Sequence, residues 1–114
     1  MTLSPTQIRY LLMIRQLSED SNDVRSAEIA RKFGVSRASV HKALNSFEGT
    51  NLLGKERYSA VTLTDEGIRT ADSFLDIYRR IKGRLDPIMD LGDEINLEIC
   101  GFVKKYAEES NVQN

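Results

Sequence analysis

Hydrophobic residues recur every three to four positions along most of the chain, and short polar stretches separate these periodic segments. Such spacing is typical of amphipathic helices, which bury one face against a core. Residues 52–63 differ, because 52–57 and 60–63 resemble two short strands around Tyr58 and Ser59, and in the second of them Val61 and Leu63 alternate with Ala60 and Thr62. The pattern therefore predicts a mainly α fold with one small β-hairpin.

Two short helices joined by a tight corner are predicted between residues 24 and 47. Gly34 lies between them, and glycine adopts the left-handed backbone that ends a helix without steric cost. Ser26 and Ser36 stand where their hydroxyl groups can cap the first and the second helix. Three residues at helical spacing mark the side of the second helix expected to face the core: Val40, Leu44 and Phe47.

The other side of the second helix is polar and mixes small residues with long ones. Small side chains allow close approach to a DNA major groove, and long polar ones reach base edges and phosphates. This combination indicates a helix-turn-helix whose second helix reads DNA. The residues expected on bases or phosphates are Ser36, Arg37, Ser39, His41, Lys42 and Asn45, with Arg25 and Arg31 flanking them on phosphate.

The hairpin over residues 52–63 follows this second helix directly, which is the position of a wing. The residues at or near its tip are expected to touch phosphate or the minor groove of DNA; they are Lys55, Arg57, Tyr58 and Ser59. A hairpin that only completes the core is the alternative.

Three further helices are predicted. The first starts at Ser4-Pro5 and the longest at Thr64, each with a capping hydroxyl, and the last covers about residues 94–109. The first and the longest have more apolar circumference than one small core needs, so we expect each to meet a partner chain as well. For the first helix, packing within its own core alone is the alternative. On the longest the two stripes are Ile68, Ala71, Leu75, Tyr78 and Phe74, Ile77, Ile81; the last has Ile95, Ile99, Phe102, Val103 and Tyr106 at helical spacing. A short segment is predicted from Asp86-Pro87 to Leu91.

The charge distribution is uneven, although the net charge of the 114 residues is only −1. Basic residues gather between residues 25 and 42, where Glu28 is the single acid, and acids gather after residue 86. Such asymmetry favours phosphate at the basic end, although two ordinary solvated faces would look the same. The longest apolar run, Tyr10 to Ile14, is too short to span a bilayer, and no secretion signal is visible. With one cysteine, a cytoplasmic location is expected.

Few residues offer other chemistry. Cys100 stands beside apolar positions and is expected to be a buried thiol. His41 is the only histidine, and no glycine-rich phosphate loop or Ser/His/Asp set is present, so no enzymatic activity is predicted. Four acids near the last helix could suggest a cation site, but their spacing is irregular: Asp90, Asp93, Glu94 and Glu98.

The order of elements and several motifs resemble the metal-dependent repressors of the diphtheria toxin repressor and manganese transport regulator family. The similar stretches are Ser26 to Ala30, Gly34 to Ser36, Ser39-Val40, Leu44, Tyr58 and Leu63 to Gly67, and the similarity fades beyond Gly92. The resemblance implies a DNA-binding homodimer that carries metal. The family's ligand positions fall here on Arg9, Leu12, Tyr78, Lys82, Asn96, Cys100, Val103 and Lys104, of which only Cys100 is a ligand-type residue. We therefore expect no metal site and no cofactor.

The sequence thus predicts a winged helix-turn-helix DNA-binding domain over residues 1–67 and a helical dimerisation region over residues 68–114. The predicted function is a sequence-specific transcription regulator that binds double-stranded DNA as a homodimer, without metal and without a membrane. The alternatives are a manganese- or iron-responsive repressor that uses Cys100 and nearby acids, and a winged helix that binds protein. A small organic effector held between the long helices is also left open.

Overall fold

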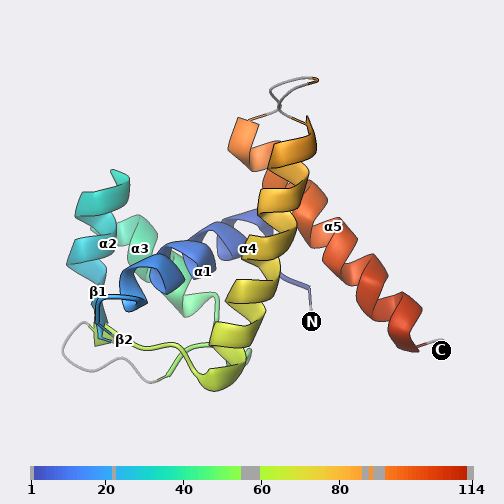
Figure 1. The fold of residues 1–114 in the computed structure, drawn as a ribbon. Helices are drawn as coiled ribbons and strands as arrows, with labels where there is room; N and C mark the ends of the chain where they lie inside the picture. The colour runs from blue at the N-terminus through green and yellow to red at the C-terminus, as the bar shows by residue number, and fades with distance from the viewer. Residues whose placement is uncertain (1, 22, 55–59, 86–87, 89–91, 113–114) are drawn as a thin grey trace.

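The structure is a computed structural model that describes residues 2–21, 23–54, 60–85, 88 and 92–112, with side chains in the last segment given for 92 and 94–105. Five helices and two short strands follow one another in the described residues (Figure 1). They are α1 (Pro5–Ser18), β1 (Val24–Arg25), α2 (Ser26–Phe33), α3 (Arg37–Asn45), β2 (Ala60–Val61), α4 (Asp65–Leu85) and α5 (Gly92–Val112). The predicted mainly α fold with a small β element is confirmed.

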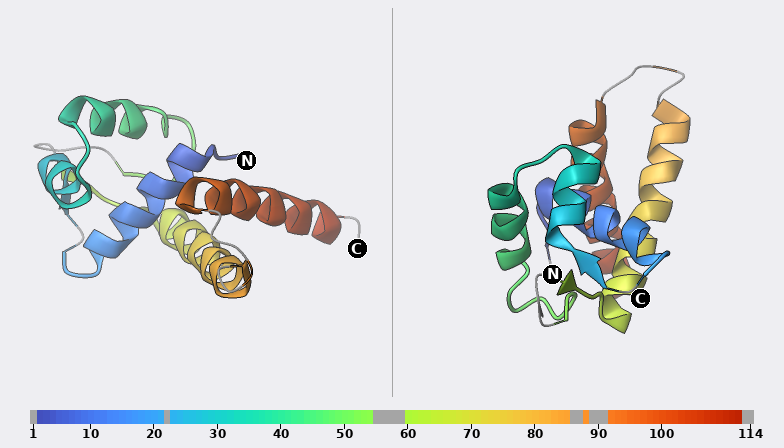
Figure 2. Two further views of the ribbon diagram at one scale, coloured as in Figure 1. Left: turned by 90° about the horizontal axis from the view of Figure 1, so that it is seen from above. Right: turned by 90° about the vertical axis from the view of Figure 1, so that its left-hand side faces the viewer.

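Helix α1 is the centre of the fold. It contacts α2, α3 and β1 on one side and α4 and α5 on the other, as the two views of Figure 2 show. Ile8, Leu11 and Ile14 are fully buried along it. The sequence predicts a partner chain against one side of this helix. In the structure α4 and α5 of the same chain pack on that side, and the contact with a partner chain stays a prediction.

Side-chain caps fix where most helices begin. The Ser4 hydroxyl accepts the Gln7 N–H while the Gln7 amide oxygen accepts the Ser4 N–H, which is a complete capping box on α1. The Thr64 hydroxyl accepts the Gly67 N–H at the start of α4. The predicted Ser26 cap is wrong. Ser26 is instead the buried first residue of α2. The cap position is occupied by Arg25, which has an extended backbone because it belongs to β1 and whose side chain makes no capping hydrogen bond.

The sheet differs from the predicted hairpin. β2 pairs antiparallel with β1, which precedes α2, so that Val24 lies opposite Val61. The predicted partner segment contributes a bridge between Leu53 and Leu63 and a bond from the Gly54 N–H to the Thr62 carbonyl at 2.8 Å. The sequence pattern does not identify β1, because a strand of two residues is too short to show an alternation. Residues 55–59, which include the wing residues Arg57, Tyr58 and Ser59, lie outside the described residues.

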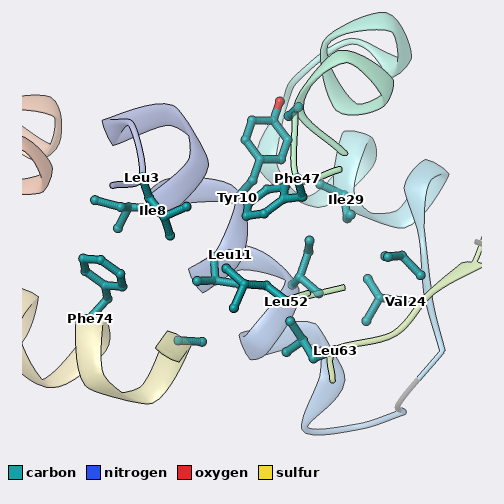
Figure 3. Packing of buried hydrophobic residues seen from close by; sticks show 14 of the residues in the cluster. Leu3, Ile8, Tyr10, Leu11, Val24, Ile29, Phe47, Leu52, Leu63 and Phe74 are labelled. Carbon is teal, nitrogen blue, oxygen red and sulfur yellow. The ribbon is translucent and has the colours of Figure 1, made fainter. Parts of the chain in front are cut away.

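One hydrophobic core joins all the helices. Figure 3 shows side chains from α1, β1, α2, α4 and the segment after α3 converging around Leu11 and Leu52. Gly67 brings the start of α4 against this segment, since a Cβ there would overlap the carbonyl oxygen of Leu52. Both apolar stripes of α4 contribute to the core, with Ala71 and Phe74 buried and Ile77 partly buried against it. Neither stripe is therefore left wholly for a partner. α4 also continues past Gly83 to Leu85, and of the predicted segment 86–91 only Ile88 is described.

Helix α5 turns most of its regularly spaced apolar residues away from the core. Its buried side chains are Asn96, Leu97 and Cys100, whereas Ile95, Phe102 and Val103 are exposed and Ile99 is half-buried. The Tyr106 side chain lies outside the described residues. The physical reason is close packing. A Cβ on Gly101 would come within 3.2 Å of Ile8 Cδ1, so α5 approaches α1 with its small residues and leaves the bulky ones outside.

Candidate nucleic-acid interface

The corner between α2 and α3 has the local structure that a helix-turn-helix requires. Gly34 adopts φ 65° and ψ 33° and closes α2 through its N–H to the Ala30 carbonyl. The Val35 N–H bonds to the same carbonyl at 3.1 Å. Ser36 then caps α3, because its hydroxyl oxygen accepts the Ser39 N–H at 3.0 Å. The roles predicted for Gly34 and Ser36 are confirmed.

Helix α3 buries one side and exposes the other. Val40 and Ala43 are buried, Leu44 is partly buried, and Phe47 is buried in the turn that follows the helix. The predicted candidates on this helix are all exposed: Ser36, Arg37, Ser39, His41, Lys42 and Asn45. The structure thus brings these six side chains together on one solvent-facing surface, which we call the α3 face and which also includes the exposed Ala38.

The α3 face has a centre and two edges. At about 100° per residue, the side chains that point most directly away from the buried side are Ala38, His41, Lys42 and Asn45, while Arg37 lies on one edge and Ser39 on the other. A small residue between two polar ones suits approach to base edges, where side chains such as asparagine can bond in pairs. The edges suit contacts to the two phosphate backbones that border a groove.

The N-terminal end of α3 offers hydrogen-bond donors. The Ser36 hydroxyl donates to the Ser39 hydroxyl oxygen at 2.9 Å, so the Ser39 hydroxyl hydrogen stays available. The exposed first turn of a helix also presents backbone N–H groups and a partial positive charge. This end is therefore arranged to bind an anion such as a DNA phosphate.

Helix α1 holds the other end of α3. The Gln7 Nε2 donates to the Ser46 carbonyl at 2.9 Å and lies 3.3 Å from the Ser46 hydroxyl oxygen. A cavity of about 550 Å³ lies beside this contact, and its lining includes the cations Arg9 and Lys42, the hydroxyl of Ser39 and the acid Glu94. Arg9 is exposed, and the sequence does not predict that it lies beside α3, because the packing of α1 on α3 leaves no local signal. Its position adds a cation to the α1 side of the α3 face.

Further exposed cations lie on α2 and in the strand before it. The predicted flanking residues Arg25 and Arg31 are exposed, as is Lys32. Glu28, the acid within this stretch, is partly buried. The basic end of the chain seen in the sequence is thus an exposed basic surface around α2 and α3.

The residues that the resemblance relates to metal binding give a poor donor set. Burial raises the pKa of the Cys100 thiol to about 11, while nearby Lys104 acts in the opposite direction. The thiol donates to the Phe74 carbonyl at 3.4 Å, so the predicted buried thiol is confirmed. The thiolate is the form that binds metal, and such a pKa makes it scarce at neutral pH. Among the residues with described side chains, no three His, Cys, Asp or Glu are placed to share a metal ion.

Comparisons with known proteins agree with this geometry. The model of the IclR helix-turn-helix domain matches residues 8–57, which include most of α1 together with β1, α2 and α3. No curated protein matches the chain. None of the helices that the structure describes is long and apolar enough to cross a membrane.

Several solved structures share the fold. The IdeR protein of T. acidophilum is 24% identical with a TM-score of 0.61 over 88% of this chain, which spans about half (48%) of that protein. A ZitR variant of Lactococcus lactis is 22% identical with a TM-score of 0.61 over 96% of this chain and 76% of its own. A MarR/EmrR family transcriptional regulator from Acinetobacter sp. ADP1 is 18% identical with a TM-score of 0.52 over 90% of this chain and 74% of its own.

The chain is therefore a winged helix-turn-helix protein of the type found in DNA-binding transcription regulators. The more specific resemblance, to the diphtheria toxin repressor and manganese transport regulator family, stays a prediction.

Proposed function

We propose that this protein is a sequence-specific transcription regulator that binds a two-fold symmetric DNA site as a homodimer. The observation that carries the proposal is the α3 face, on which six polar or basic side chains stand exposed over a buried apolar side. A helix that needed this face for folding would bury it. An exposed, capped and basic-flanked helix at this point of a helix-turn-helix fits a major groove.

Each contact then has a chemical role. His41 and Asn45, near the centre of the α3 face, reach base edges, and Arg37 reads a base edge or a phosphate from its margin. The contacts to phosphate come from Arg9, Arg25, Arg31, Ser36, Ser39 and Lys42, and the wing residues Arg57, Tyr58 and Ser59 reach the adjacent backbone or minor groove. Two subunits place their α3 helices in successive major grooves, about 34 Å apart.

We also propose that DNA binding is independent of metal. The positions related to metal ligands are occupied by cations at Arg9 and Lys82, which oppose a divalent ion, and by the protonated thiol of Cys100. Selection of bound sequences from random duplex DNA, with and without Mn²⁺ and Fe²⁺, tests both parts. We expect one palindromic consensus in both conditions. Failure to enrich any sequence would contradict sequence-specific binding, and enrichment only with metal would contradict metal independence.

A further inference from the structure

Helix α5 carries an apolar stripe that the rest of the described chain leaves uncovered. Phe102 is 71% exposed and Ile95 is 46% exposed, and half-buried Ile99 continues the stripe between them, with Val103 (39% exposed) at its margin. Positions 95, 99 and 102 are spaced by four and three residues, so they lie on one side of the helix. Figure 1 and the left view of Figure 2 place α5 at the edge of the molecule.

A continuous apolar stripe marks an interaction surface, whereas scattered apolar residues do not. The spacing of four and three residues is also the spacing with which helices pack side by side in pairs. One flank of the stripe carries two exposed charges of opposite sign, Glu98 and Lys105, which are seven residues or two helical turns apart. The other flank, at Asn96 and Val103, carries no charge.

This charge pattern complements itself in one orientation. When two copies of α5 pack antiparallel about a two-fold axis between residues 100 and 101, Ile99 meets the partner subunit's Phe102. Glu98 then faces the partner subunit's Lys105, and the symmetry repeats the pair on the other side of the axis. A parallel pair would instead set Glu98 against the uncharged flank.

We propose that two copies of this chain associate through antiparallel α5 helices, with the apolar stripe at the centre and two reciprocal Glu98–Lys105 ion pairs at its margin. The inference rests on the homodimer of the proposed function and specifies its interface. The apolar contacts supply most of the affinity, because exposed ion pairs contribute little. The charges select the orientation.

Analytical ultracentrifugation of the full chain without DNA tests the interface. We expect F102E to abolish the dimer at concentrations where the wild type is dimeric. E98K and K105E should each weaken dimerisation roughly tenfold, since each turns two attractive pairs into two repulsive ones. The double variant E98K/K105E should regain wild-type dimerisation, and an equimolar mixture of the two single variants should form heterodimers. E48K, which changes an exposed charge on the turn after α3, is the control and should dimerise as the wild type does.

Each result separates the interface from the proposed function. If F102E dimerises like the wild type, α5 is not the interface, although the homodimer stands. If the single variants are weakened but the double variant and the mixture are not restored, the antiparallel order is wrong. If the wild type is a monomer at all concentrations, the interface and the homodimer both fail, whereas DNA binding by α3 is measured separately. The charge variants alter only exposed side chains, so they keep the test decisive if F102E does not fold.

Discussion

The Nε2 amide of Gln7 donates to the backbone carbonyl of Ser46 at 2.9 Å, which joins the first turn of α1 to the end of α3. The same Gln7 side chain closes the capping box of α1 with its amide oxygen. One residue therefore starts the central helix and fixes the C-terminal end of α3. The orientation of the α3 face relative to the rest of the domain depends on this bond.

Replacing Gln7 with alanine should lower stability and DNA affinity together. Loss of the bonds to Ser4 and Ser46 is expected to reduce the free energy of unfolding by about 1–2 kcal/mol. Gln16→Ala is the matched control, because Gln16 is an exposed glutamine near the other end of the same helix. Urea denaturation and anisotropy titrations would measure both effects. If the two variants have the same free energy of unfolding and the same DNA affinity, the Gln7–Ser46 bond does not fix the position of α3.

Arg37→Ala should weaken binding to the selected duplex by about 1–3 kcal/mol if Arg37 reads a base edge, and it should relax the preference at that base pair. Arg84→Ala is the control, since Arg84 is an exposed arginine near the far end of α4 (Figure 1). Fluorescence anisotropy at fixed salt measures both. An unchanged affinity for the Arg37 variant would remove this residue from the interface.

Lys42→Ala should remove a contact to a DNA phosphate and leave the sequence preference unchanged. Binding to selected and unrelated duplexes is expected to weaken alike, and the slope of log affinity against log salt should fall by about 1. The measurement is a salt series with both duplexes. A change that is confined to the selected duplex would instead assign Lys42 to base recognition.

Two glycines of α4 should respond in opposite ways to alanine. Gly67→Ala introduces a Cβ that overlaps the Leu52 carbonyl, so we expect a loss of about 1–3 kcal/mol. Gly83→Ala meets no atom within 4 Å and should stabilise the helix by about 0.5–1 kcal/mol. Thermal unfolding distinguishes them. A stable Gly67 variant would show that α4 does not approach the segment after α3 so closely.

The Cys100 thiol should resist alkylation in the folded protein at pH 8 and react after denaturation. Burial raises its pKa to about 11, so the folded state keeps the proton to higher pH than the unfolded state does. This contribution to stability is complete below the unfolded pKa, near 8.5, and is lost as the pH rises through 11. Iodoacetamide labelling followed by mass measurement checks the reactivity. Rapid labelling of the native protein would contradict burial of this side chain.

The local signals of the sequence predict most of the fold. Gly34, Ser36, Ser4 and Thr64 mark helix ends through backbone freedom or side-chain caps, and these effects involve only neighbouring residues. The apolar period of α3 likewise predicts which of its sides is exposed. Whether that exposed side contacts DNA is a separate matter that the experiments above address.

The features that the sequence does not predict have non-local causes. Ser26 resembles a cap, but the pairing of Val24 with Val61 places a strand directly before α2. The orientation of α5 depends on Gly101 fitting against Ile8, a contact between residues far apart in the chain. Helical periodicity shows that α5 has an apolar side without telling whether that side meets its own core. The position of Arg9 beside α3 is likewise a relationship between residues far apart in the chain, which periodicity does not show.

The binding of a selected duplex by a variant in which Arg37, His41 and Asn45 are all alanine tests most directly whether α3 reads DNA. Alanine keeps the helix, so circular dichroism and the melting temperature should match those of the wild type. We predict a loss of at least about 100-fold in affinity for the selected duplex, together with loss of discrimination against unrelated DNA. Wild-type affinity and discrimination in the folded triple variant would show that the recognition surface lies elsewhere.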